Sequence, residues 1–152
     1  MSKGYDVIIV GVGAMGSAAA YHLAKRGRRV LGLDRFTPPH TLGSSHGQTR
    51  IIREAYFEHP VYVPMVQRAY ALWEELERES GADLLRITGG VMIGRPESEV
   101  FAGARRSAVE HGLRHEVLTA SEVRRKFPAL HPGDEMQAVW EQIGRASCRE
   151  RV

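Results

Sequence analysis

Cysteine is almost absent from this sequence: the only one among 152 residues is Cys148, close to the C-terminus. A single thiol excludes a disulfide scaffold and a cysteine metal cluster, so we expect no metal site. No run of about 18 apolar residues occurs, and a membrane span is therefore not predicted. The short apolar run at the N-terminus leads into glycines, which indicates a first strand rather than a signal peptide. We expect a cytoplasmic protein.

The excess of positive charge is concentrated at the C-terminus. A formal charge of +3 and a pI of 9.3 would suggest a nucleic-acid partner. However, the segment 143–152, IGRASCRERV, holds three arginines and one glutamate and so contributes +2 of the +3. The basic pI belongs largely to this segment, and no nucleic-acid partner is predicted.

The same segment does not resemble folded protein sequence. It follows the strand-like QAVWE without turn residues, periodicity or an apolar face. Reverse translation as ATC GGA AGA GCG TCG TGT AGG GAA AGA GTG resembles in-frame read-through of a common sequencing adapter, and a CAG codon for Gln142 would supply the leading AG. A disordered basic tail is the alternative. We expect natural sequence to end near Glu141 and the segment 143–152 to make few buried contacts with residues 1–141.

Hydrophobic patterning predicts an α/β fold that begins with one βαβ unit. The apolar run 5–10 is typical of a buried parallel strand, residues 14–27 of a helix that ends at a glycine, and residues 28–34 of a second strand. A loop rich in Pro, Gly, Ser and His covers residues 35–48, and loops of this length are often functional.

The rest of the chain predicts shorter elements. Thr49 is a plausible N-cap of a short helix. The expected elements are, in chain order, a helix at 49–56, a helix at 63–81, a strand with a glycine kink at 86–94, a helix at about 97–111, a strand at 115–118, a helix opened by the capping box 119–122, and a strand at 137–141.

Gly11, Gly13 and Gly16 form a GxGxxG pattern between the first predicted strand and helix. The first glycine would permit a tight turn, the second would let a pyrophosphate approach the backbone, and the third would allow close packing of the helix on the strand. Asp34, at the end of the second strand, can accept hydrogen bonds from an adenosine ribose. The pattern predicts a dinucleotide site that fits FAD and NAD equally. A ligand-free turn and a solvated acid are the alternatives.

Four stretches carry a resemblance to a known family. They are DVIIVGVGAMG, PPHTLGSSHGQTRIIREAY, YVPMVQRAYALWEELE and ITGGVMIG. From about Tyr5 to Glu141 the sequence resembles the flavin amine oxidases of the monomeric sarcosine oxidase and N-methyltryptophan oxidase family. The Ser-His-Gly-x-Thr-Arg-x-x-Arg signature is more specific than the glycine pattern. The resemblance implies a truncated chain, with the first segment of a Rossmann-like FAD-binding domain at 1–85 and the beginning of a mixed-sheet substrate domain at 86–142.

Two arginines of this signature are candidate functional residues. Arg50 and Arg53 are three positions apart and would share one face of a helix. A guanidinium binds a carboxylate through two parallel hydrogen bonds. The resemblance implies that Arg53 holds the substrate carboxylate, helped by a lysine from the C-terminal half. It places His46 and Arg50 against the flavin ring, where positive charge favours the reduced, anionic flavin. A solvated helix face and a surface histidine are the alternatives.

The remaining candidates for cofactor binding lie in or beside the same loop. Gly43 and Ser44 would let the chain pass close to the flavin, and Thr49 belongs to the signature. Arg35 is a further cofactor candidate. It could instead contact the 2′-phosphate of NADP, although the neighbouring Asp34 would repel that phosphate.

Three positions depart from familiar members of the family. Ser45 stands where a second histidine is frequent, Gln48 replaces an aspartate, and Glu54 replaces a histidine. These changes leave the predicted cofactor intact and leave the substrate open.

The resemblance also implies the reaction. A hydride equivalent passes from the carbon next to a secondary amine, as in sarcosine, to FAD; the imine hydrolyses, and dioxygen is reduced to hydrogen peroxide. The full-length enzyme is expected to be monomeric. Its flavin-linking cysteine and oxygen-activating lysine would lie beyond Glu141, so covalent attachment of FAD is left open and the 152-residue chain is expected to be inactive. The alternatives are an NAD(P)-dependent dehydrogenase and a non-catalytic nucleotide-binding protein.

Overall fold

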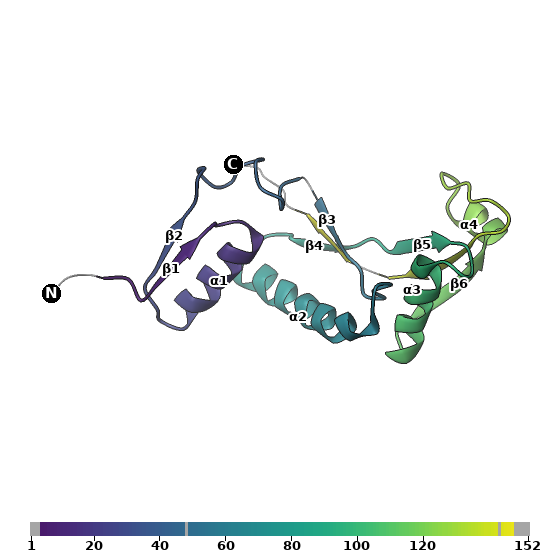
Figure 1. The fold of residues 1–152 in the computed structure, drawn as a ribbon, viewed down its shortest axis with the longest axis horizontal. Helices are drawn as coiled ribbons and strands as arrows, with labels where there is room; N and C mark the ends of the chain where they lie inside the picture. The colour runs from purple at the N-terminus through teal and green to yellow at the C-terminus, as the bar shows by residue number, and fades with distance from the viewer. Residues whose placement is uncertain (1–3, 48, 143, 148–152) are drawn as a thin grey trace. The chain divides into compact units, whose positions relative to one another are not determined.

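A computed structural model describes residues 4–47, 49–142 and 144–147 (Figure 1). Within these residues the chain forms two compact units, which divide between Gly47 and Gln48. The division concerns compactness alone, so the assignment of 1–85 and 86–142 to two domains of a longer enzyme stays a prediction. No helix in the described part of the chain is long and apolar enough to span a membrane.

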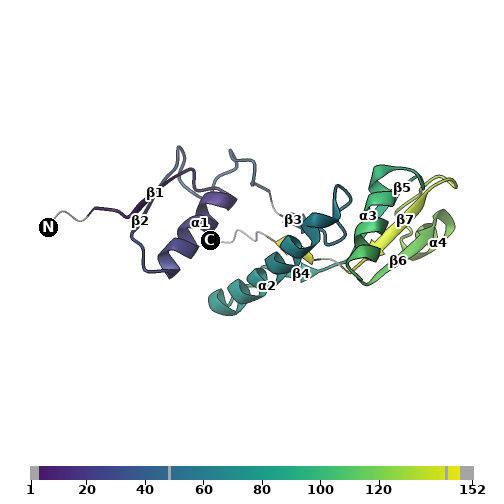
Figure 2. The same cartoon turned by 60° about the horizontal axis from the view of Figure 1, so that its bottom comes forward.

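The first unit contains the predicted βαβ motif. Strand β1 (Val7–Val10) pairs in parallel with β2 (Val30–Leu33), and α1 (Ala14–Lys25) connects them and lies against both (Figure 2). Gly27 ends the helix at φ 74°, with its N–H donating to Ala24 and the N–H of Arg28 donating to Leu23. This pair of bonds is the Schellman motif, which needs a glycine in the left-handed region.

The sheet of the first unit is too narrow to bury α1. The helix has no buried residue, and Met15, which heads its apolar stripe, is 88 % exposed. Two strands of four residues offer less surface than a helix of three turns presents.

The second unit begins with an antiparallel sheet of order β3-β8-β4, formed by β3 (Thr49–Ile52), β8 (Gly144–Ser147) and β4 (Leu85–Ile87). The short η1 (Pro60–Tyr62) leads into α2 (Val63–Ser80), which ends at Gly81 as predicted. The helix is tied to β3 by the Tyr70 hydroxyl, which donates to the Ile52 carbonyl at 2.7 Å. It is tied to the start of β4 by Glu77, whose Oε1 accepts from two backbone N–H groups at 2.8 Å.

The prediction of a helix at 49–56 is wrong, and so is Thr49 as its N-cap. Residues Thr49–Ile52 are a strand. Threonine and isoleucine are branched at Cβ and favour extended backbone, and the segment finds a partner strand in β8, from Thr49↔Ser147 to Ile52↔Gly144. The sequence could not show this, because four residues are too few to distinguish helical from strand periodicity. The partner strand β8 also lies far away in the sequence.

The sequence predicts few buried contacts between the segment 143–152 and residues 1–141, yet the backbone of Gly144–Ser147 pairs with two strands of that part of the chain. These residues form β8, the middle strand between β3 and β4. A β-ladder is built from backbone N–H and C=O groups, so an extended segment of almost any composition can take this place. The adapter origin concerns the nucleotides and stays a prediction. Ile143 and residues 148–152, with Cys148, lie outside the described residues.

The predicted strand at 86–94 is two strands that belong to different sheets. β4 ends at Ile87, and β5 (Gly90–Gly94) begins after Gly89, whose φ is 77°. A residue at this φ leaves the strand direction, and glycine adopts it without steric cost. The expected kink is therefore the crossing from one sheet to the next.

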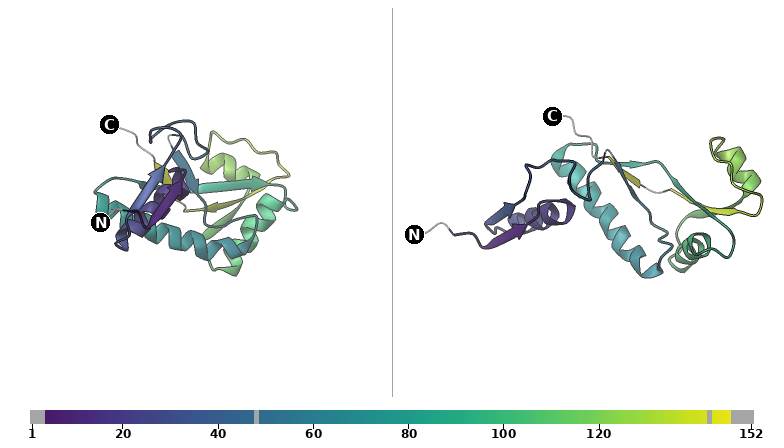
Figure 3. Two further views of the ribbon diagram at one scale, coloured as in Figure 1. Left: turned by 60° about the vertical axis from the view of Figure 1, so that its left-hand side comes forward. Right: turned by 45° about the horizontal axis from the view of Figure 1, so that its top comes forward.

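The second sheet of this unit has the order β5-β7-β6, with β6 (His115–Thr119) and β7 (Gln137–Glu141). Helices α3 (Glu99–Glu110) and α4 (Ala120–Lys126) pack against it (Figure 3). Both helices and both strands occur where the sequence predicted them. The capping box is also confirmed, with Thr119 and Glu122 each accepting a hydrogen bond from the other's backbone N–H.

Side chains that alternate along β5 and β7 build two apolar layers. Met92 and Val139, a register pair, face a cluster with α3. Ala138 packs with Leu118 and with Val123 of α4. Because successive residues of a strand point to opposite faces, the two helices cover opposite sides of the sheet.

Candidate functional site

The turn between β1 and α1 requires two of its three glycines. Gly11 has a φ of 91°, and its N–H donates to the Leu33 carbonyl at 2.7 Å. A Cβ on Gly16 would overlap the carbonyl oxygen of Gly11 and press on the Ile9 side chain at 3.2 Å. The tight turn and the close packing of helix on strand are thus present as the sequence predicted.

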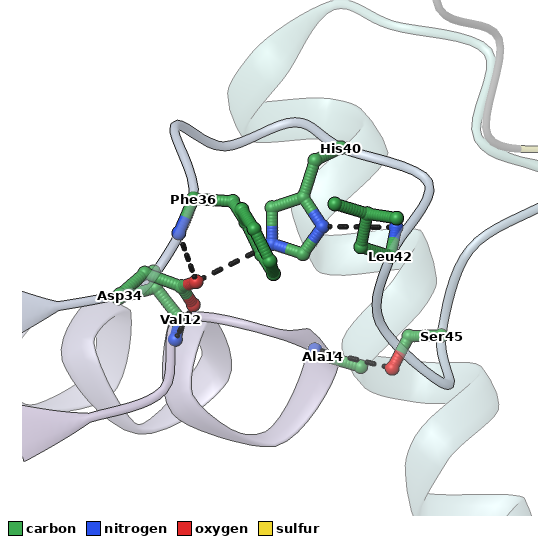
Figure 4. A network of polar contacts seen from close by, with 7 residues as sticks. All are labelled: Val12, Ala14, Asp34, Phe36, His40, Leu42 and Ser45. Atoms are coloured by element: carbon green, nitrogen blue, oxygen red, sulfur yellow. Dashed lines mark hydrogen bonds and ion pairs between the residues drawn. The ribbon is translucent and has the colours of Figure 1, made fainter.

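Gly13 precedes the first residue of α1, where backbone N–H groups point out of the helix. A Cβ at Gly13 would meet only the Ser45 hydroxyl, at 3.9 Å. That hydroxyl also accepts from the Ala14 N–H at 3.4 Å (Figure 4). The helix N-terminus therefore has a polar neighbour from the loop and room for an anion.

Ser45 was not among the predicted cofactor residues. Sequence reasoning noted it only as a departure from the family. A small polar residue in a glycine-rich loop gives no indication by itself of which helix end it will reach.

Asp34 lies at the end of β2 with its carboxylate facing the turn. Its Oδ2 accepts from the Val12 N–H at 2.6 Å, and its Oδ1 accepts from the Phe36 N–H at 3.1 Å (Figure 4). These two N–H groups, together with His40, hold the pKa of Asp34 below its ordinary value of 3.8, against the opposing effect of burial. The group is an anion at neutral pH and orders the loop after β2.

His40 is a second residue that the sequence did not single out. Its Nδ1 accepts from the Leu42 N–H at 3.1 Å, so the ring hydrogen of a neutral imidazole lies on Nε2. Nε2 is 3.3 Å from Asp34 Oδ1 and donates to it. Oδ1 thus accepts from Phe36 and His40. Oδ2 accepts from Val12 and has a second lone pair that could accept from a ribose hydroxyl.

A hollow of about 470 Å³ opens beside this carboxylate. The Arg35 guanidinium lies 5.4 Å from the centre of the Phe36 ring, at the same edge. The hollow is lined by Val12, Gly32, Asp34, Arg35, Phe36, Thr37 and Pro38. Its size and its single carboxylate suit the adenosine part of a dinucleotide, and the glycine turn next to it suits the pyrophosphate. The residues present fit FAD.

The loop residues predicted to contact the flavin contact one another. The Gly43 carbonyl accepts from both the backbone N–H and the ring Nδ1 of His46. Contact of Gly43, Ser44 and His46 with a flavin stays a prediction. Gln48, one of the departures from the family, lies outside the described residues.

Arg50 and Arg53 do not share a helix face, because Arg50 belongs to β3 and Arg53 follows its last residue. Arg53 instead belongs to the turn 53–58. Its guanidinium lies 4.4 Å from the Phe57 ring centre and 4.8 Å from the Tyr56 ring centre.

Glu58 completes the surroundings of Arg53. Its Oε1 lies 3.1 Å from Nη2 of the arginine, and both side chains are partly exposed. The guanidinium is therefore close to two aromatic rings and pairs with an internal carboxylate, and its role in substrate binding stays a prediction. In the sequence, Glu58 is only an acidic residue five positions after Arg53, and this spacing does not predict an ion pair.

The chain is similar to known proteins over most of its length. The sequence profile described as FAD dependent oxidoreductase matches residues 6–150. A monomeric sarcosine oxidase of Streptomyces avermitilis is 54 % identical over 142 residues, which cover 93 % of this chain. An N-methyl-L-tryptophan oxidase of Yersinia pestis is 41 % identical over 137 residues, or 90 % of this chain. In both cases the chain spans 37 % of the length of the relative.

A solved structure with the same fold is that of NikD, described as an unusual amino acid oxidase essential for nikkomycin biosynthesis. The superposition has a TM-score of 0.82 at 26 % identity and covers 94 % of this chain and 37 % of NikD.

Proposed function

The chain belongs to the family of FAD-dependent oxidoreductases, and we propose that it is the N-terminal part of an enzyme that oxidises the secondary amine of a small, N-methylated amino acid. The observation that carries the proposal is Arg53, whose guanidinium lies near the rings of Tyr56 and Phe57 and can pair with a carboxylate, as it does with that of Glu58 at 3.1 Å. Relatives named for sarcosine and for N-methyl-L-tryptophan support the substrate class, since both substrates pair a methylated amine with a carboxylate.

The first unit would hold the cofactor. The turn Gly11–Gly16 would bind the pyrophosphate at the N-terminus of α1, and Asp34 would accept from the ribose. When bound, FAD supplies the acceptor for the two electrons and the hydrogen that leave the carbon next to the amine nitrogen. Ser45, already in contact with the Ala14 N–H, would turn its hydroxyl towards a phosphate oxygen.

The second unit would hold the substrate. Arg53 would bind the carboxylate through two parallel hydrogen bonds, which fixes the direction of the bond from the carboxylate to Cα and so limits where the amine can lie. Roles of Arg50 and His46 at the flavin remain part of the proposal. Dioxygen as the second substrate, a monomeric state and a cytoplasmic location also belong to it, and the name of the monomeric sarcosine oxidases supports the monomer.

The test of the carboxylate site is Arg53→Ala in the full-length enzyme. Losing a charged, bidentate contact and leaving its partner unpaired costs about 2–5 kcal/mol. We expect a corresponding loss of kcat/KM for N-methyl amino acids and weaker inhibition by acetate, with FAD retained. Arg86→Ala is the control, because Arg86 is an exposed arginine paired with Asp83 at 3.6 Å. Unchanged acetate inhibition in Arg53→Ala would refute the site.

The test of the cofactor site is the visible absorbance of the purified full-length protein. Bound flavin absorbs in the visible range, whereas a nicotinamide cofactor does not. Gly13→Leu places a side chain in front of the helix N-terminus and should abolish flavin retention. A colourless wild-type protein that binds NADP would refute FAD as the cofactor.

A further inference from the structure

Glu141, the last residue of β7, is a buried carboxylate to which the proposed reaction gives no role. It is 2 % exposed, and its two oxygens accept from consecutive backbone N–H groups, Oε1 from Glu54 at 3.2 Å and Oε2 from Ala55 at 2.9 Å. Those two residues directly follow Arg53. One side chain therefore connects the end of β7 to the turn that carries the candidate substrate arginine.

In this arrangement each of the two N–H groups has an oxygen of its own, Oε1 for Glu54 and Oε2 for Ala55. A glutamine has one oxygen, so in the same conformation its NH2 group would face one of the two donors. Burial raises the pKa of Glu141 above its ordinary value of 4.5, whereas the Ala55 and Glu54 N–H groups and the charge of Arg53 oppose that rise.

Further contacts attach the same turn to both neighbouring helices. The Ser107 hydroxyl of α3 donates to the Tyr56 carbonyl, and a Cβ on Gly103 of the same helix would overlap the Phe57 carbonyl oxygen. On the other side, Gln67 of α2 donates to Glu54 Oε1 at 3.0 Å. The turn is thus held at several points, and Glu141 holds the two backbone N–H groups that directly follow Arg53.

We propose that Glu141 is a positioning residue: by accepting from the Glu54 and Ala55 N–H groups it sets the direction in which Arg53 presents its guanidinium, and thereby the affinity for the substrate carboxylate. This inference rests on the proposed function, in which Arg53 binds that carboxylate. A bidentate contact requires two of the five guanidinium N–H groups to meet the two carboxylate oxygens in one plane, so a small rotation of the turn weakens it.

The experiment compares Glu141→Gln with wild type in the full-length, flavin-loaded enzyme. The readouts are KM and kcat for sarcosine, and the inhibition constant of acetate as a carboxylate probe, each per bound flavin. Loss of hydrogen bonds to a charged group should raise KM and the acetate constant about tenfold, with a smaller effect on kcat. Glu77→Gln is the matched control, because the Glu77 carboxylate also accepts from two consecutive backbone N–H groups, at the start of β4.

Combining the variants separates positioning from stability. If Glu141 acts through Arg53, Glu141→Gln should have little further effect in an Arg53→Ala background. Equal effects in both backgrounds, or reduced flavin content with unchanged acetate affinity, would overturn the inference. Unchanged acetate affinity in Arg53→Ala alone would instead overturn the proposed function.

Glu141→Asp is the second variant if the glutamine protein does not fold. Its carboxylate retains the charge but lies one methylene group further from the turn, so it cannot reach both N–H groups. It should also raise the acetate constant, and an acetate constant equal to that of wild type would overturn the inference.

Discussion

Asp34 accepts a hydrogen bond of 2.6 Å from the backbone N–H of Val12, which joins the end of β2 to the glycine turn that follows β1. The bond fixes the carboxylate relative to the N-terminus of α1. The proposed ribose and pyrophosphate sites would therefore be held at a set separation before any ligand binds.

The first prediction concerns the acid sensitivity that this bond creates. The pKa of Asp34 is lowered on folding, so its ionised form stabilises the protein above the ordinary value of 3.8, and that contribution is lost as the pH falls through the lowered pKa. The free energy of unfolding in urea should be measured from neutral pH to about pH 3 for wild type and Asp34→Asn. We expect wild type to be the more stable protein, and its advantage should shrink as the pH falls below 3.8. Glu97→Gln, an exposed acid, is the control. A difference that stays constant down to the lowest pH would contradict the prediction.

The second prediction concerns the packing of α1 on β1. Gly16→Ala places a methyl group against the Gly11 carbonyl, so the helix must move away from the strand and the turn must change. We expect the full-length protein to lose most of its flavin, measured as the ratio of flavin to protein absorbance. Gly4→Ala should retain it, because a Cβ there meets nothing within 4 Å. Full flavin content in both variants would show that the turn tolerates the change.

The third prediction concerns the internal partner of Arg53. Glu58→Gln removes the negative charge 3.1 Å from the guanidinium, so an incoming carboxylate no longer competes with it. Because partly exposed ion pairs contribute little, we expect acetate to bind roughly twofold to fivefold more tightly. Glu135→Gln, whose carboxylate lies 3.9 Å from Arg95, should leave acetate binding unchanged. Weaker acetate binding in Glu58→Gln would mean that Glu58 assists the carboxylate site rather than competing with it.

The fourth prediction concerns the segment 143–152. If it is translated adapter, the underlying nucleotides should match the adapter codon by codon, and the same locus read from genomic DNA should diverge after about Glu141. Synonymous codons scattered through the segment would show that it is encoded by the organism.

Local sequence determined the elements whose signals lie within a few residues. The apolar run before Gly11, the acid Asp34 after the second run and the Schellman glycine Gly27 each act on their own neighbours, so the βαβ unit could be predicted. The capping box of Thr119 and Glu122 is equally local, since each residue satisfies the other's backbone. The GxGxxG turn needed no tertiary information, because Gly11 and Gly16 are required by the turn itself.

Tertiary structure decided the features that depend on distant partners. Residues Thr49–Ile52 form a strand because β8, almost a hundred positions away, supplies the backbone groups that pair with them. The link from Glu141 to the turn of Arg53 joins residues 86 and 87 positions apart, and the sequence shows only an acid on the inward face of a strand. A short segment carries too little periodicity to choose its own state, and a buried carboxylate can be assigned a partner only once the chain has brought the donors to it.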